Sequence, residues 1–196
     1  METNFRRLVF YLSRENRNRR RLSPAQIVAL SFAFAILLGT GALLLPISYV
    51  PGRQVELLDA LFTATSAICV TGLTVMDTGS DFSRFGQVVI LLLIQIGGFG
   101  IITVGTFIAF FSGRRIGFRE RLTLQAQINS LHVGGVVKLI KRIMFLVFGA
   151  ELAGTLLLYF RFAEEEGVEE GVFYALFHSI SAFNNAGFSL YSDSLA

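Results

Sequence analysis

The sequence has little charge, a single cysteine and no tryptophan. Asp, Glu, Lys and Arg make up only 16% of its 196 residues, compared with about 25% in soluble globular proteins. The lone cysteine, Cys69, excludes an intramolecular disulfide and any metal site built from several cysteines. The sequence also lacks an HExxH motif and a Ser/His/Asp set, which are signs of metalloprotease and hydrolase chemistry. Nothing in it therefore indicates an enzyme.

Long hydrophobic runs occupy much of the chain. Hydrophobic residues make up 53% of it, and the mean hydropathy is +0.62. Residues 25–45 and 85–113 carry no charge, and residues 143–160 carry only Glu151. A transmembrane helix needs about 20 predominantly apolar residues. The sequence therefore predicts an all-α integral membrane protein with a span in each of these runs, the third starting as early as Val136.

Basic residues concentrate in two segments. Of the 17 Lys and Arg residues, seven lie in residues 1–22 and seven in residues 114–142. Positive charge beside membrane spans marks the cytosolic side, so both segments, and with them the N-terminus, are predicted to be cytosolic. A nucleic-acid-binding arm is an alternative for residues 1–22, but topology control and contact with anionic lipids explain the charge more simply. An acidic loop predicted at residues 161–171 then faces the outside.

Two shorter apolar stretches do not fit a membrane span. The uncharged stretch between Asp59 and Asp77 is only 17 residues long, and it includes threonine, serine and glycine. We interpret 59–75 as re-entrant, with a short helix, a turn and a strand-like return, because non-helical backbone at membrane depth must be buried or line a water-filled path. The pattern returns in 174–190, with six identities at an offset of 115 residues. Two similar buried core helices are the alternative interpretation.

Each of these stretches contains a tripeptide ending in glycine that suits an ion pore, VTG at 70–72 and NAG at 185–187. A dehydrated cation needs oxygen ligands in place of water, and backbone carbonyls supply them without a formal charge. Glycine admits positive φ, which lets successive carbonyls turn towards one axis. The C-terminal end of a preceding short helix also carries partial negative charge. The two tripeptides therefore predict a cation path lined by backbone carbonyls.

Several motifs in a fixed order carry a resemblance to a known family. They are TATSAICVTGL (63–73), LIQIGGFGI (93–101), GRRIGFRERLTLQAQIN (113–129), GVVKLIKRI (135–143) and FHSISAFNNAGFSL (177–190). The chain resembles the membrane subunits of the Trk/Ktr/HKT superfamily of potassium transporters, and most of all their KtrB-type branch. The resemblance implies a subunit of four helix–pore loop–helix repeats, each with one filter glycine. It also implies a homodimer and a cytosolic ring of nucleotide-binding regulatory subunits of the KtrA type.

The resemblance also implies which residues bind potassium. Within the family, glycine at the first filter position goes with potassium selectivity and serine there with sodium permeation, so Gly72 points to potassium. The usual threonine of the first filter strand is replaced here by Cys69. The filter residues implied are Cys69, Val70, Thr71, Gly72, Asn184, Asn185, Ala186 and Gly187.

The family pattern divides the chain into four parts. These are a basic cytosolic arm (1–22), a first helix–pore loop–helix repeat (23–113), a cytosolic connection (114–134) and a second repeat truncated before its last span (135–196). The expected protein is a multi-pass protein of the plasma membrane that takes up potassium, and this chain is expected to be a fragment supplying two of four filter strands. A non-conducting assembly or regulatory subunit and a sodium-permeable transporter are the alternatives.

The remaining expectations concern partners and isolated polar residues. Docking of the regulatory ring is assigned to Arg114, Arg115 and Arg119. No cofactor is expected in this chain; potassium is the transported ion, sodium stays open as an activator, and nucleotide is expected only on the partner. Three roles are open for Glu151: transport, snorkelling towards the membrane surface, or a hydrogen bond to a neighbouring helix. His178 is interpreted as a packed, hydrogen-bonded side chain.

Overall fold

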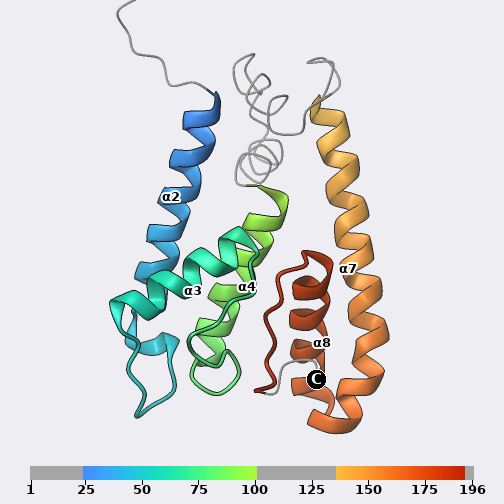
Figure 1. Cartoon of the computed structure of the whole chain (residues 1–196). Coiled ribbons are helices and arrows are strands. Elements are labelled where there is room, and N and C mark those ends of the chain that lie inside the picture. Colours follow the sequence, from blue (N-terminus) through green and yellow to red (C-terminus); the bar gives the residue numbers. More distant parts are fainter. Residues whose placement is uncertain (1–23, 101–135, 193–196) are drawn as a thin grey trace, which may run out of the picture.

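The computed structural model describes residues 24–100 and 136–192, and their regular structure is helical (Figure 1). Within these two ranges there is no β-strand, only an isolated antiparallel bridge between Tyr49 and Phe82. The prediction of an all-α chain is confirmed for this part. The elements are α2 (Pro24–Leu43), the 3-10 helix η1 (Pro46–Ser48), α3 (Leu57–Cys69), α4 (Arg84–Phe99), α7 (Val136–Glu166) and α8 (Val168–Phe183).

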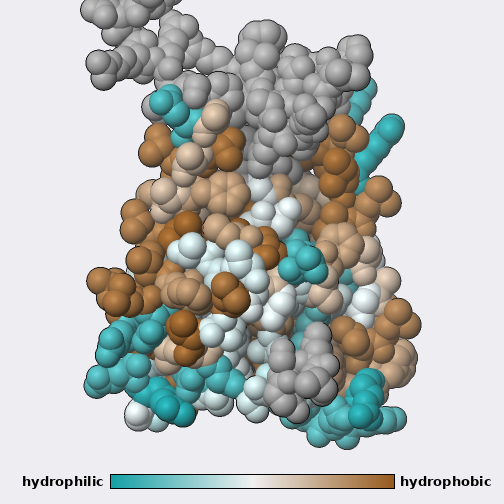
Figure 2. Space-filling view, viewed as in Figure 1, coloured by the Kyte–Doolittle hydropathy of each residue, from teal (hydrophilic) through white to brown (hydrophobic). Residues whose placement is uncertain are grey.

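Two helices are long and apolar enough to cross a membrane, Ala25–Leu43 within α2 and Lys138–Glu166 within α7. Their outer faces expose leucine and phenylalanine side chains to an unusual extent, with Leu37 66% and Leu157 76% exposed. Figure 2 shows these hydrophobic residues along both flanks, over α2 and α7, and hydrophilic residues near the junction of α7 and α8. Helices of this length and surface fit a bilayer.

The prediction of an acidic loop at residues 161–171 is wrong. Helix α7 continues through Arg161 to Glu166, and only Gly167 separates it from α8. Glutamate, alanine and arginine are good helix formers, and Arg161 pairs with Glu165 one turn later. Gly167 ends the helix because it adopts a φ of +84°, which glycine tolerates at little cost.

The short helices α3 and α8 pack against the long helices at equivalent positions. In α2, a side chain built on Gly39 would approach the Ala64 Cβ of α3 to 3.4 Å. In α7, Gly154 lies directly against the Ser179 hydroxyl of α8. Both members of the second pair lie 115 residues beyond those of the first. The packing of a long helix on a short one therefore repeats with the same offset as the sequence.

Helix α4 lies between the two long helices and contacts both short ones (Figure 1). Its Gly97 sits against the backbone of Ile68 in α3, and its Gly98 against the side chain of Asn184 at the end of α8. Close approach of this kind is what small residues allow between helices. The uncharged run 85–113 is not one uninterrupted helix, because α4 ends at Phe99 and Gly100 takes a φ of +76°; residues 101–113 lie outside the described residues.

We predict that Gly97→Ala destabilises the protein. The new Cβ would lie 2.8 Å from the carbonyl carbon and 3.1 Å from the Cα of Ile68, and overpacking against backbone costs about 1–3 kcal/mol. The measurement is the thermal unfolding midpoint of the purified protein in detergent. Gly41→Ala is the matched control, since no atom lies within 4 Å of its added Cβ. Equal midpoints for the two variants would contradict the packing described here.

Candidate functional site

The two predicted re-entrant stretches leave their helices through the same turn. After α3, the Val70 N–H donates to Ala67 O and the Thr71 N–H to Ser66 O, at 3.3 and 3.0 Å. After α8, Asn185 and Ala186 make the corresponding bonds to Ala182 and Ser181, at 3.0 and 2.7 Å. This is the Schellman pattern of helix termination. Neither stretch is therefore an unbroken helix.

In both turns, the residue that redirects the chain has a left-handed backbone conformation. Val70 has a φ of 56° and Asn185 a φ of 55°. Asparagine tolerates this region, but for a β-branched residue it is a genuine outlier and costs about 1–3 kcal/mol. Both residues were predicted to belong to the filter, but their left-handed conformation was not predicted. Only the asparagine at 185 gave a local signal for it. Strained residues of this kind cluster at functional sites, so the backbone conformation of Val70 marks this turn as a candidate site.

The two glycines that follow these turns lie against each other. Gly72 and Gly187 both have a φ of +73°. A Cβ added to Gly72 would lie 2.7 Å from Ala186 O and 3.1 Å from the Gly187 Cα, and one added to Gly187 would lie 3.1 Å from the Gly72 Cα. Both the backbone conformation and the contact therefore require glycine here. The fold thus brings together two predicted site segments that are 115 residues apart.

Both turns leave carbonyl oxygens without a donor among the residues that the structure describes. Among the described residues, no hydrogen bond ends on the carbonyl oxygens of residues 70–72 or 185–187. Thr71, Asn185 and Gly187 are exposed, Val70 and Gly72 are half-buried, and Ala186 is buried. The peptide oxygens on both sides of the glycine contact are therefore available as ligands, and for a cation they are suitable ones.

Polar side chains of α8 anchor the chain that follows Gly187. The Nδ1 of His178 lies 2.8 Å from Tyr174 O, so Nδ1 donates, and Nε2 accepts from the Leu190 N–H at 3.3 Å. The hydroxyl of Ser181 donates to Phe188 O at 2.6 Å. His178 is thus the packed, hydrogen-bonded side chain predicted from the sequence, and it holds the return of the chain against α8.

The chain after the second segment is tied to the end of α7. The Tyr191 hydroxyl donates to Glu166 Oε1 at 3.2 Å. Burial and the neighbouring Glu166 carboxylate raise the pKa of Tyr191 to about 12. The hydroxyl therefore stays protonated near neutral pH and remains a donor.

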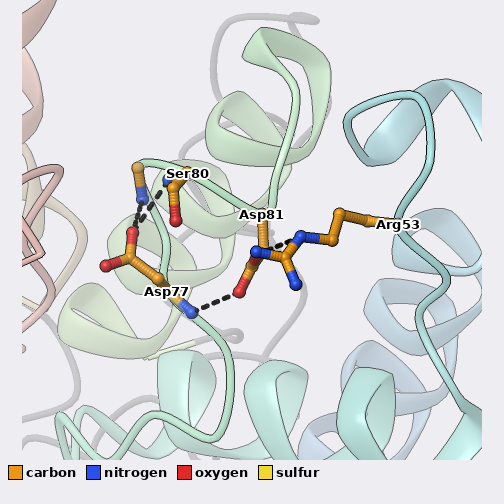
Figure 3. Close-up of polar contacts among 5 residues, drawn as sticks. Arg53, Asp77, Ser80 and Asp81 are labelled. Atoms are coloured by element: carbon orange, nitrogen blue, oxygen red, sulfur yellow. Dashed lines mark hydrogen bonds and ion pairs between the residues drawn. The ribbon is translucent and has the colours of Figure 1, made fainter.

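The loop between the first segment and α4 is held by two aspartates (Figure 3). Asp77 Oδ1 accepts from the N–H groups of Gly79 and Ser80, both at 2.8 Å. Asp81 Oδ2 accepts from the Asp77 N–H at 2.9 Å, and Asp81 Oδ1 pairs with Arg53 at 3.1 Å. These carboxylates therefore shape the loop.

A buried acid lies behind the second segment. Glu151 of α7 is only 4% exposed, and its carboxylate accepts hydrogen bonds from Gln95 of α4 and Asn184 at the end of α8. A hydrogen bond from Glu151 to a neighbouring helix was one of the alternatives open from the sequence, which did not indicate the partner. Gln95, a long polar side chain within an apolar run, was the available signal.

The other predicted site residues fall elsewhere. Cys69 ends α3 and is exposed. Arg114, Arg115 and Arg119, assigned to docking, lie outside the described residues. Within the described ranges, no group of three or more His, Cys, Asp or Glu residues could hold a metal ion.

The chain is similar to known cation transport proteins over nearly its whole length. The profile of the cation transport protein family, TrkH, matches residues 7–196. The Ktr system potassium uptake protein B of Bacillus subtilis is 45% identical over 89% of this chain and 39% of its own length. The protein of the same name from Vibrio alginolyticus is 40% identical over 95% of the chain and 41% of its length. The potassium/sodium uptake protein NtpJ of Enterococcus hirae is 38% identical over 92% of the chain and 40% of its length.

The chain thus spans about two fifths of the length of the curated relatives it matches. The family profile covers both glycine-containing segments and the helices that hold them. The resemblance seen in the sequence motifs is confirmed, and the chain belongs to the TrkH family of cation transport proteins.

Proposed function

We propose that this chain forms part of a potassium-uptake transporter, in which it supplies two of four filter strands. The strands are 69–72 and 184–187. The observation that carries the proposal is the contact between Gly72 and Gly187, both at a φ of +73°. Around it lie peptide oxygens that make no hydrogen bond among the described residues. The names of three relatives, which include potassium uptake, support the choice of ion.

The mechanism follows from the chemistry of the backbone. Potassium sheds its water when carbonyl oxygens replace the hydration shell at little cost. Each left-handed turn, at Val70 and at Asn185, redirects the chain away from the axis of the short helix before it. The C-terminal ends of α3 and α8 add partial negative charge at the start of each strand. Selectivity then depends on backbone positions, since no charged side chain is present in either strand.

The proposal includes an arrangement in the plasma membrane. Family membership implies a membrane location, and α2 and α7 are long enough to span it. The first unit, residues 23–113, contains α2, α3 and α4, and the second, residues 135–196, contains α7 and α8. The basic segments 1–22 and 114–134 are on the cytosolic side. A nucleotide-binding regulatory ring docks on that side, and the complete transporter is a homodimer.

A sodium-permeable transporter is the second candidate function. One relative is named a potassium/sodium uptake protein. Gly72 favours potassium, because the family residue that goes with sodium permeation is serine. A non-conducting assembly subunit is the third candidate, and only a flux measurement separates it from the first two.

We predict that a complete transporter carrying this chain takes up potassium selectively. In the test, this chain replaces the aligned stretch of the Bacillus subtilis relative, and the chimaera is expressed in cells that lack their own potassium uptake. We expect growth at low potassium and potassium uptake that exceeds sodium uptake. Purified residues 1–196 in liposomes are the matched control and should give no potassium flux, because two strands do not enclose an ion. A chimaera that reaches the membrane without transporting would favour the assembly subunit.

We predict that Gly72→Ser in the chimaera lowers its preference for potassium over sodium. The Cβ of the new serine would lie 2.7 Å from Ala186 O, and the φ of residue 72 is unfavourable for any residue with a Cβ. Both strands must therefore shift. Rubidium and sodium uptake measured side by side report the change. Gly52→Ser is the matched control, since Gly52 also has positive φ but no atom lies within 4 Å of an added Cβ. An unchanged preference in Gly72→Ser would argue against the filter assignment.

We predict that the end of α7 faces the outside of the cell. Cys69 is first replaced by threonine, which removes the chain's own thiol, and Glu166→Cys is then introduced into the chimaera. Glu166 is exposed, so an impermeant thiol reagent should label it in intact cells. Lys138→Cys, near the other end of the same helix, should react only after permeabilisation. The opposite pattern would invert the proposed orientation.

A further inference from the structure

Glu151 joins three helices at one point. It lies in α7, and its carboxylate accepts from the side-chain amide of Gln95 in α4 at 2.9 and 3.2 Å. It also accepts from the Asn184 side-chain amide at 3.2 Å. Glu151 is only 4% exposed, and its bonds to the half-buried Gln95 and Asn184 are part-buried. Hydrogen bonds to an ionised carboxylate are stronger than bonds between neutral groups. A carboxyl group at this depth requires such partners.

Asn184 is the residue where α8 ends and the second strand begins. Its side-chain amide also donates to Ile180 O at 2.9 Å, and its side chain rests against Gly98 of α4. Asn184 is therefore held on three sides, and Glu151 supplies the side that comes from α7. The peptide oxygens of residues 185–187 follow it directly.

Glu151 also holds α8 through its backbone. Its carbonyl oxygen accepts from the Ser179 hydroxyl at 2.7 Å, in the last turns of α8. Gly154, one turn further along α7, leaves room for the same hydroxyl. Two independent contacts thus fix the end of α8 relative to Glu151.

Within residues 24–100, the described part of the first unit, the corresponding positions do not form this network. At the offset of 115 residues, Ile36 corresponds to Glu151 and Cys69 corresponds to Asn184. Ile36 has no side-chain hydrogen-bonding group, and it packs against the apolar core. The two units therefore share the turn and the glycine but not the support behind them. A carboxylate retained in only one of them points to a task specific to the second strand.

We infer that Glu151 is a positioning residue for the second filter strand. Through Asn184 it sets where the peptide oxygens of residues 185–187 lie, and through Gln95 it ties that strand to α4, which also contacts α3. This inference rests on the proposed function, because the strand matters for selectivity only if ions pass it. Glu151 itself does not touch the ion path.

The test uses Glu151→Gln in the chimaera described above. The amide keeps the size of the side chain but offers one acceptor oxygen, and its NH2 group faces the donor of Gln95. We expect the KM for potassium to rise, or the potassium-to-sodium uptake ratio to fall, by about tenfold, the factor that corresponds to about 1.4 kcal/mol. Uptake is normalised to the amount of protein in the membrane. A purely structural role would lower that amount and leave KM and the ratio unchanged.

A swap variant provides the rescue. Gln95→Glu combined with Glu151→Gln restores a carboxylate–amide pair with the carboxylate on α4, and leaves an amide oxygen at 151 for Asn184. We expect KM and the uptake ratio to return towards the parent values. Thr155→Val is the matched control, because its hydroxyl donates to the Glu151 backbone carbonyl and not to the carboxylate.

The outcomes separate the inference from the function on which it rests. A parent chimaera without potassium-selective uptake overturns both. A selective parent with parent-like KM and ratio in Glu151→Gln overturns the inference alone. If Glu151→Gln does not reach the membrane, Gln95→Met removes two of the three bonds to the carboxylate while retaining the one to Asn184. Parent values of KM and ratio in that variant, or no rescue in the swap, also overturn it.

Discussion

The contact between Gly72 and Gly187 is the constraint on which the rest of the structure depends. Two backbones that approach this closely leave no room for a side chain on either. To bring them there, α3 and α8 must end just before the contact, and each does so through a left-handed residue. The strain at Val70 belongs to this helix end, since a Schellman turn needs a left-handed residue there and a β-branched residue is strained in that conformation.

The helices are spaced so that this contact can form. Where helices or strands must come close, the chain has a glycine: Gly97 faces Ile68 of α3, and Gly98 faces Asn184. In a bilayer, apolar surface alone does not drive helices to associate. Close packing of small residues and interhelical hydrogen bonds stabilise their association instead. Helix α4 uses both, because Gln95 of the same helix donates to Glu151.

The two units satisfy their polar groups differently. Non-helical backbone at membrane depth must find partners within the protein. In the first unit, Thr71 turns back to Ser66, whereas in the second unit Ser181, His178 and Glu151 each hold a different part of the return.

The sequence by itself determined the helical class, the two long apolar helices of the described residues, the 115-residue repeat and the family, because each depends on patterns along the chain. It also placed glycine at 72 and 187, where the local backbone requires it. It failed at residues 161–171, where charge suggested a loop but helix propensity and the Arg161–Glu165 pair extend α7. Only the tertiary structure decided that the two glycines touch and that Glu151 meets Gln95 and Asn184. Those contacts join residues that are far apart in the chain. Hydropathy patterns indicate whether a residue prefers an apolar environment, but they do not specify which residue it contacts.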